Sequence, residues 1–358
     1  MLKRFLAVML VILAMTNPFL GKNQEALEDI DIISCIIADV NTKGEKPGDL
    51  VFSFLSNKTS KATSESPDEY SANEGYGDSI GECILDASSN TEKTLFLGQV
   101  KTIILTKAFA EDRQRMYNFL DYAQRDSYLS YALTLYLLDD EESKLNEKIK
   151  EKDDDTKNFL DNIILKSPMQ DCLAMRLYQI AEGGGTFYIP LLELKDSLTY
   201  QGIGVIRDYQ FETMFPLEDS IYYQLITCEV LDQYLKLDDG EISILKSNKK
   251  LKKEDGLNFT LTINMRCEIT TYPKEKAIER QDAFRFDEAV KSKLEKECSE
   301  LIRALQKNNA DIFGLTKYMK RYHPKELKQY EEEGVDVFGE ANVRVVVKPK
   351  VVQTGIMY

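Results

Sequence analysis

The chain has 358 residues, of which 43% are hydrophobic, and it carries a formal net charge of −14 at pH 7 with a pI of about 4.8. This length exceeds one ordinary core, so we expect two or three folded domains. The negative charge excludes nucleic acid as the natural partner. It also argues against loose binding of the body of the protein to an anionic membrane.

The N-terminus has the pattern of an export signal. Two basic residues precede an apolar run over residues 5–15, and an Asn-Pro pair follows it. The run is shorter than the roughly 20 residues that span a bilayer, so a secretory signal peptide fits best. Two alternatives stay open: an uncleaved anchor extended through Phe19, and an ordinary buried helix. We assign residues 1–22 to this signal or anchor segment. No later segment approaches membrane-spanning length.

Residues 23–157 are expected to form an N-terminal α/β domain. Apolar runs predict buried strands over 30–40 and 50–55, and a Ser- and Asn-rich stretch over 56–77 predicts a loop. The predicted strand over 94–106, helix over 110–126 and strand over 127–140 together have the length of a right-handed crossover unit, in which a helix joins two parallel strands. The elements after the loop alternate between helix and strand, over 80–87, 94–106, 110–126 and 127–140.

A charged stretch follows between Asp139 and Asp155. A cation site is one interpretation, but the stretch has no glycine for the turn of a calcium loop, so a solvated helix or a linker is favoured. A middle domain is expected over 158–236. Its triple glycine, 183–185, is part of neither GxGxxG nor GxxxxGK[ST], and it predicts a flexible turn rather than a phosphate site.

The C-terminal domain, expected over 237–358, has the clearest patterns. Apolar and polar residues alternate strictly over 257–269, which predicts a long strand with one buried face, paired in a hairpin with the segment before it. The apolar spacing over 287–307 predicts an amphipathic helix. A short helix should stop at Pro324, and a valine-rich strand closes the chain. These patterns predict an α+β fold with an antiparallel sheet against the long helix, and mixed sheets packed with helices overall.

Little in the sequence indicates catalysis. The single histidine, His323, lies beside a proline at a helix end, where we expect it to be exposed, and no nucleophile-elbow, Walker or HExxH motif is present. The six cysteines form no CxxC pair, so we interpret them as small core residues, with disulfides left open. We predict no catalytic, cofactor-binding or metal-binding residues.

Several motifs resemble the Ger(x)C family of spore germination proteins. The clearest is Asp311-Ile312-Phe313-Gly314, followed in the family's order by Pro324-Lys325 and a closing Thr354-Gly355. The segments "ALEDIDIISCIIADV" and "GIGVIRDYQFETMFPLEDS" are similar to family segments at corresponding places. Further matching residues are Leu27, Glu28, Asp29, Leu95, Phe96, Gly98, Phe119, Leu120, Arg125 and Asp126. The resemblance spans nearly everything after residue 25.

The resemblance implies three α+β-type domains and a role as the C subunit of a nutrient germinant receptor, which is not known as an enzyme. It implies assembly with an integral-membrane A subunit and a transporter-like B subunit, at the extracytoplasmic face of the spore inner membrane. Family members carry a lipid on a cysteine at the end of the signal. Here Lys22 stands at that position, and an amine cannot form the thioether, so we predict no lipid attachment.

Three functions are therefore compared. A non-enzymatic receptor subunit, held at the membrane by its signal segment or by its partners, comes first. The alternative is an extracytoplasmic small-ligand-binding protein, which requires a preformed pocket of roughly 300–1,000 Å³ with a few polar groups. A cell-wall hydrolase, with two carboxylates about 5–10 Å apart in a cleft, ranks last.

Overall fold

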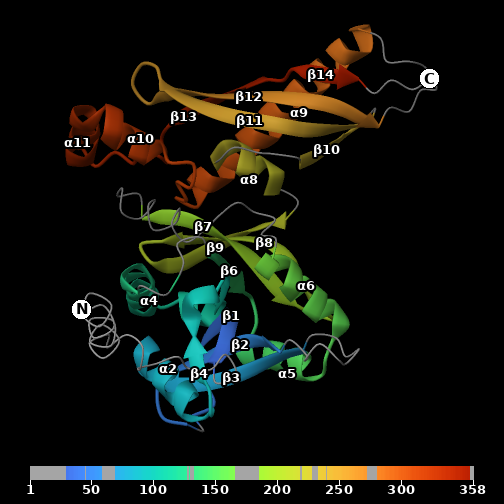
Figure 1. Cartoon of the computed structure of the whole chain (residues 1–358). Helices are drawn as coiled ribbons and strands as arrows, with labels where there is room; N and C mark the ends of the chain where they lie inside the picture. The colour runs from blue at the N-terminus through green and yellow to red at the C-terminus, as the bar shows by residue number, and fades with distance from the viewer. Residues whose placement is uncertain are drawn as a thin grey trace, which may run out of the picture.

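The computed structural model describes residues 30–354, except 45, 59–68, 127–128, 130–132, 166–184, 218–219, 228–232, 239 and 272–279. The described strands form two sheets, one of nine strands and one of five. Figure 1 shows them in separate halves of the molecule, which we call the large-sheet unit and the small-sheet unit. The predicted signal or anchor segment, 1–22, lies outside the described residues.

The large sheet is mixed and contains β1 (Ile30–Val40), β2 (Leu50–Lys58), β3 (Glu69–Gly77), β4 (Thr94–Phe96), β5 (Thr102–Thr106), β6 (Thr134–Leu138), β7 (Thr186–Leu194), β8 (Leu198–Arg207) and β9 (Gln210–Pro216). Its order is β3-β2-β1-β5-β6-β7-β8-β9, with β4 paired to β1 off this path. The central strands β1, β5, β6 and β7 are parallel, whereas β2 and β3 on one side and β8 and β9 on the other pair antiparallel.

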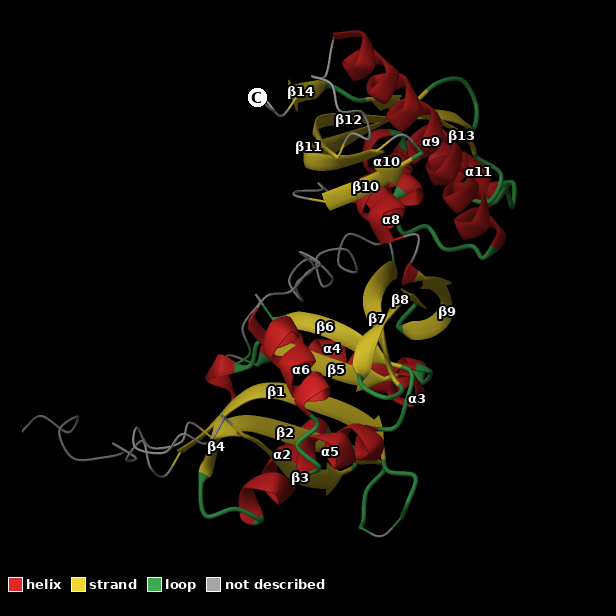
Figure 2. Ribbon diagram, turned by 90° about the vertical axis from the view of Figure 1, so that its right-hand side faces the viewer, coloured by secondary structure: helices red, strands yellow, loops and turns green. Residues whose placement is uncertain are grey.

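Helices cover both faces of the large sheet (Figure 2). They are α2 (Ile80–Ser89), α3 (Lys107–Ala110), α4 (Arg113–Arg125), α5 (Glu142–Lys150) and α6 (Asp154–Leu165). Residues of α2, α3 and α4 share a core with Ile36 and Ala38 of β1, and residues of α5 and α6 share another with Cys35 and Ile37. Because both faces are buried, the central strands are continuous apolar runs. The predicted strand, helix and parallel strand are confirmed, since β5 and β6 are parallel with α4 between them.

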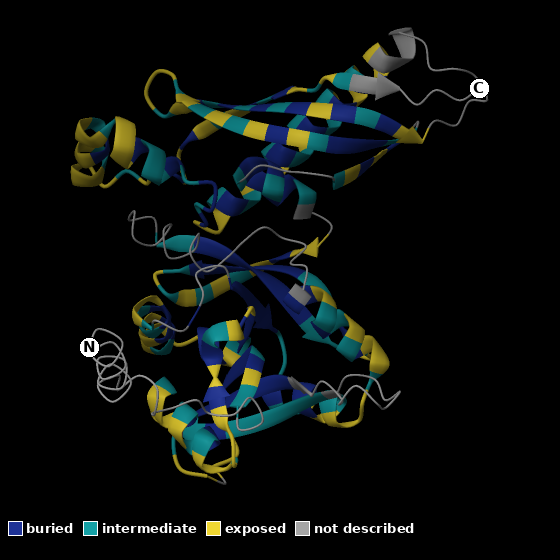
Figure 3. Ribbon diagram, in the orientation of Figure 1, coloured by how far each residue is buried: buried dark blue, intermediate teal, exposed yellow. Residues whose placement is uncertain are grey.

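The small sheet contains β10 (Gln233–Leu237), β11 (Gly240–Lys253), β12 (Asn258–Thr271), β13 (Asn342–Lys348) and β14 (Val351–Thr354). β10, β11 and β12 pair antiparallel, and β13 and β14 pair parallel with β12. One face packs on residues of α8 (Ser220–Thr227), α9 (Arg280–Lys307), α10 (Leu315–Tyr322) and α11 (Pro324–Glu332). Figure 3 shows buried residues alternating with half-buried or exposed ones along β12, as the period-2 pattern predicts. The amphipathic helix is also confirmed, with the predicted core residues Val290, Leu294, Cys298, Leu301 and Leu305 all buried.

The loop prediction for 56–77 is wrong at both ends, because β2 continues to Lys58 and residues 69–77 form β3. A Cβ on Gly75 would lie 1.9 Å from the carbonyl oxygen of Cys83, so glycine is needed there because α2 lies directly on the strand. Gly75 and Gly77 both lie against α2, so the glycines of this segment permit close packing between a strand and a helix.

The proline prediction is confirmed in part. α10 ends at Tyr322, but a new helix, α11, begins at Pro324, at a first-turn position where the missing N–H costs nothing. The valine-rich strand at the C-terminus is divided into β13 and β14 on either side of Pro349.

The α+β class with mixed sheets is confirmed. The C-terminal sheet was predicted to be antiparallel and is itself mixed, because β13 and β14 pair parallel with β12. The large sheet holds strands from both sides of residue 157, where the sequence analysis divides the N-terminal domain from the middle domain, because β7 pairs with β6. The small sheet begins with β10, close to the predicted boundary at 236 and 237. The division into three domains stays a prediction.

Candidate functional site

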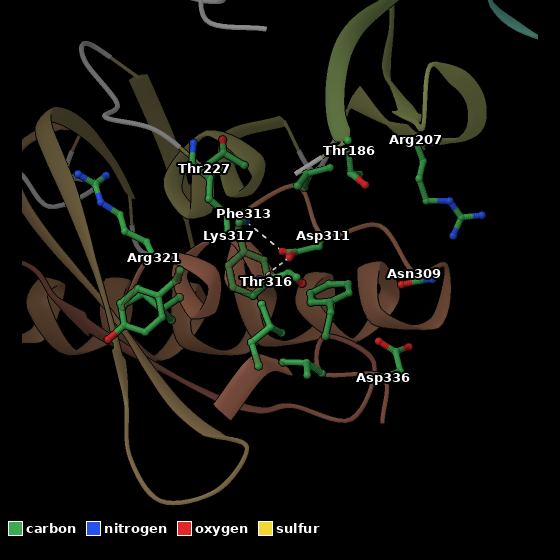
Figure 4. A pocket seen from close by; sticks show the side chains of 18 of the residues that line it. Thr186, Arg207, Thr227, Asn309, Asp311, Phe313, Thr316, Lys317, Arg321 and Asp336 are labelled. Carbon is green, nitrogen blue, oxygen red and sulfur yellow. Dashed lines mark hydrogen bonds between the residues drawn. The ribbon is translucent and has the colours of Figure 1, made fainter. Parts of the chain in front are cut away.

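A pocket of about 600 Å³ lies between the large-sheet unit and the small-sheet unit (Figure 4). Thr186 at the start of β7 and Arg207 at the end of β8 line one side. The other side comes from the small-sheet unit, mainly from residues 309–322 and 331–338. The volume falls within the range of roughly 300–1,000 Å³ that small-molecule sites occupy.

Asp311 fixes the chain at the floor of this pocket. Its carboxylate accepts backbone hydrogen bonds from Gly314 at 3.0 Å, from Leu315 at 2.8 Å and from Thr316 at 2.7 Å. These are free N–H groups at the start of α10, so the carboxylate satisfies donors that the helix itself leaves unpaired. Gly314 has a φ of 82°, which favours glycine. The Asp-Ile-Phe-Gly motif is therefore a helix start that also shapes the pocket.

Lys249 of β11 connects the pocket floor to α8 through two hydrogen bonds. Its Nζ donates to the carbonyl oxygen of Ile226 at 2.7 Å and to that of Phe313 at 3.2 Å. The ring of Phe313 meets the ring of Phe338 edge to face, with centroids 5.6 Å apart. Aromatic pairs of this geometry contribute about 0.5–1.5 kcal/mol beyond burial. The pocket wall is thus held by specific contacts from α8, β11 and the turn after α11.

Charged groups stand at the rim. Figure 4 shows Arg207 and Arg321 on opposite sides, with Asp311 between them. Arg207 forms an ion pair with Glu212, and the Arg321 guanidinium lies 5.6 Å from the ring centroid of Tyr322. Asp336 accepts a hydrogen bond from the backbone N–H of Gly339 at 3.0 Å. Because Asp311 and Asp336 are both engaged by backbone donors, the arrangement suits binding rather than proton transfer.

A second polar cluster lies at the carboxyl ends of the parallel strands in the large sheet. Asp39 lies one residue before the end of β1, and its carboxylate accepts hydrogen bonds from the Thr106 hydroxyl and, at 2.9 Å, from the backbone N–H of Glu142. Ser53 donates to the Glu142 carboxylate, and the Asn146 amide donates to Ser53 at 2.7 Å. The cluster therefore joins the N-termini of α3 and α5 to the sheet edge. A cavity of about 210 Å³ adjoins it.

Glu142 has a strongly perturbed carboxyl group in this cluster. Burial raises its pKa to about 7, and the carboxylates of Glu74 and Asp39 also raise it, against hydrogen bonds from Ser53 and Asn146 that lower it. Burial likewise raises the pKa of Asp39. The helix α5 was predicted to be a solvated helix or linker, yet Glu142 and Asn146 are buried. The available signal was the apolar pair Leu145 and Ile149, one helical turn apart.

His323 is half-buried rather than fully exposed. Its Nδ1 lies 3.1 Å from a carboxylate oxygen of Glu326, and its ring centroid lies 5.8 Å from that of Tyr318. These contacts hold it at the junction of α10 and α11. The core interpretation is confirmed for the described cysteines, whose thiols are free and buried, and burial raises their pKa; they are Cys35, Cys83, Cys267 and Cys298.

Cys172, Cys228 and Lys22 lie outside the described residues. Within the described ranges, no group of His, Cys, Asp and Glu side chains is arranged to hold a metal ion. No helix in this part of the chain combines the length and the apolar character needed to cross a bilayer.

Two family models match the chain in succession. The spore germination protein N-terminal domain matches residues 23–194, and the C-terminal domain described as spore germination B3/GerAC like matches residues 201–355. A search among curated proteins finds no match. The crystal structure of the GerBC protein aligns with a TM-score of 0.58 and 14% sequence identity, over 85% of this chain and 93% of that chain.

These matches define a spore germination protein with two family domains. The chain belongs to the Ger(x)C family, as its motifs indicate, and it shares the α+β fold of the GerBC protein.

Proposed function

We propose that the chain is the C subunit of a nutrient germinant receptor and that it assembles with membrane A and B subunits to trigger spore germination. The observation that carries this proposal is the match of both family domains, in order, over residues 23–194 and 201–355. The chain acts at the extracytoplasmic face of the spore inner membrane. The basic and apolar start of the sequence supports this location, because that pattern directs export.

The proposed role is contact rather than catalysis. Two of the charged groups that line the pocket are engaged in holding the fold, since Asp311 caps α10 and Lys249 binds two carbonyl oxygens. His323 is paired with Glu326. Side chains that hold the fold in this way fix the shape of a contact surface, as a subunit without catalytic activity requires.

Co-purification tests the assembly. An affinity-tagged copy of the full chain, expressed from its own locus, is recovered from spore membranes in mild detergent, with a tagged unrelated membrane protein as the control. We expect the A and B subunits to be recovered with the tagged chain and not with the control. Recovery of the chain alone, from membranes that contain both subunits, would contradict the proposal.

A second candidate function, binding of a small extracytoplasmic ligand, is favoured by the pocket of about 600 Å³. Calorimetric titration with amino acids and sugars tests it, using a variant that fills the pocket, Thr186→Trp, and a matched control on an exposed strand position, Thr199→Trp. We expect a true ligand to bind the wild type and the control but not Thr186→Trp. Equal binding to all three proteins, or no heat with any nutrient, would remove this candidate.

A further inference from the structure

The outer face of the small sheet is basic, although the chain as a whole carries a charge of −14. The residues on this face are those that alternate with the buried core residues of β11, β12 and β13. We define the basic face by its exposed cations: Lys246, Lys250, Lys252, Arg266, Arg344 and Lys348. Over the same stretch of these described strands, the other outward residues are Asn, Thr and Val, and none is acidic.

Strand register brings these cations together. Lys246 lies directly opposite Arg266. Thr260 lies between Lys252 on one neighbouring strand and Arg344 on the other, and adjacent strands are only about 4.8 Å apart. Like charges directly opposite each other destabilise a sheet. The fold alone would therefore favour an acidic residue at one of these positions, so the pattern points to an external anion.

The cations are available to such an anion. Lys252 pairs with Glu254 at 3.0 Å, but the other five have no ion-pair partner among the described residues. The carboxylates next along the outer face, Glu241 and Glu268, lie beyond the bulge in β11. At physiological salt the Debye length is about 8 Å, so acidic groups on the large-sheet unit are screened from this face. The net charge of the chain therefore does not describe the local potential.

The composition of the face distinguishes between anionic partners. Interfaces between proteins have apolar or aromatic centres and are depleted in lysine. Here the outward residues between the cations are mainly Asn248, Thr260, Thr262 and Asn264. The apolar residues beside them are two half-buried side chains, Val346 of β13 and Leu245 in the bulge of β11. A lysine-rich face without aromatic anchors suits many interchangeable anionic groups spread over a surface. Lipid headgroups have this arrangement.

We propose that the basic face of the small sheet binds the anionic headgroups of a membrane surface. It gives the folded part of the chain an electrostatic membrane contact separate from its N-terminal apolar run. This contact does not require the receptor subunits, so its test is independent of the proposed function.

The test uses the purified full chain with vesicles of phosphatidylcholine alone, or with about 30 mol% phosphatidylglycerol to give a negative surface potential. The apolar N-terminal run can enter either bilayer, so the readout is the ratio of the two binding constants. The test variant is Lys250→Gln/Arg266→Gln/Lys348→Gln. The control, Lys93→Gln/Lys101→Gln/Lys325→Gln, removes the same charge from exposed sites elsewhere.

Each cation near an anionic surface contributes roughly a fivefold factor to binding. We therefore expect the test variant to lose on the order of 100-fold in preference for the anionic vesicles. The control should lose much less, and high salt should abolish the preference. The wild-type protein should also show reduced acylation of Lys250 and Lys348 on anionic vesicles, but not of Lys93.

Three results would overturn the proposal: no preference of the wild type for anionic vesicles, equal losses in both variants, or unchanged acylation of Lys250 and Lys348. Preferential binding to polyglutamate over vesicles would also overturn it and would assign the face to an acidic protein. Circular dichroism of each variant establishes that it is folded. Failure in this assay leaves the receptor assembly untouched.

Discussion

Replacing Glu142 with glutamine should stabilise the protein at alkaline pH and have little effect at acidic pH. The folded state raises the pKa of Glu142 from 4.5 to about 7, chiefly through burial. The folded protein therefore holds this proton more tightly than the unfolded chain. Protonated Glu142 therefore contributes favourably to the free energy of unfolding at low pH, and this contribution is lost as pH rises from about 4.5 to about 7. Above that range the fold contains a buried carboxylate.

The size of the effect follows from the shift. One pKa unit corresponds to about 1.4 kcal/mol, so the shift of Glu142 corresponds to about 3 kcal/mol of unfolding free energy between the two ends of the pH range. Glutamine is neutral at every pH and keeps an acceptor oxygen for Ser53. We therefore expect Glu142→Gln to be within about 1 kcal/mol of the wild type at pH 5. At pH 8 it should be more stable by about 2–3 kcal/mol.

Urea unfolding of the full chain at the two pH values measures this difference. Circular dichroism is the natural signal because the chain has no tryptophan. Glu147→Gln is the matched control, since it makes the same change at an exposed position of α5. The reasoning is refuted if Glu142→Gln changes the unfolding free energy equally at pH 5 and pH 8, or if the control shows the same pH dependence.

Other predictions concern local backbone and thiol chemistry. Asp311→Ala should lower the unfolding free energy by about 1–2 kcal/mol, because α10 loses its cap; a loss below about 0.3 kcal/mol in urea unfolding would contradict this role. Gly314→Ala should destabilise by about 1 kcal/mol, because its φ is 82°. Gly81→Ala should instead stabilise the protein by up to about 1 kcal/mol, because Gly81 lies in α2 and a Cβ there would meet open space. If Gly314→Ala and Gly81→Ala shift the midpoint of thermal unfolding in the same direction, the φ angle does not decide the outcome. The described cysteines should resist iodoacetamide at pH 8 in the folded protein and react in urea, as read by mass spectrometry; they are Cys35, Cys83, Cys267 and Cys298. Labelling in the folded state would contradict their burial.

The sequence predicts elements well where one physical requirement dominates. β12 has one buried face, so its apolar residues recur at every second position, and α9 has one buried stripe, so Val290, Leu294 and Cys298 recur at helical spacing. β3 was missed because it is a strand at the edge of the sheet, with polar residues and with glycines that accommodate α2. This segment forms a strand because it pairs with β2 and packs against α2, and its own residues show no apolar pattern that predicts one.

The candidate site could be predicted only in part. The Asp-Ile-Phe-Gly motif was recognised, but its role as a helix cap needs the geometry of Gly314 and α10. The pocket combines residues from β7, β8, β11 and α10, which are far apart along the chain and have no common pattern. Glu142 was concealed by its acidic neighbours, because the sequence gives their charge and not which side chain turns toward Ser53.

The most direct test of the central claim is deletion of the gene in its spore-forming host, followed by measurement of nutrient-triggered germination. If the chain is the C subunit of a germinant receptor, spores without it should fail to respond to at least one nutrient, and a wild-type copy should restore that response. Unchanged germination with every nutrient, in a strain that also lacks paralogues of the gene, would contradict the account.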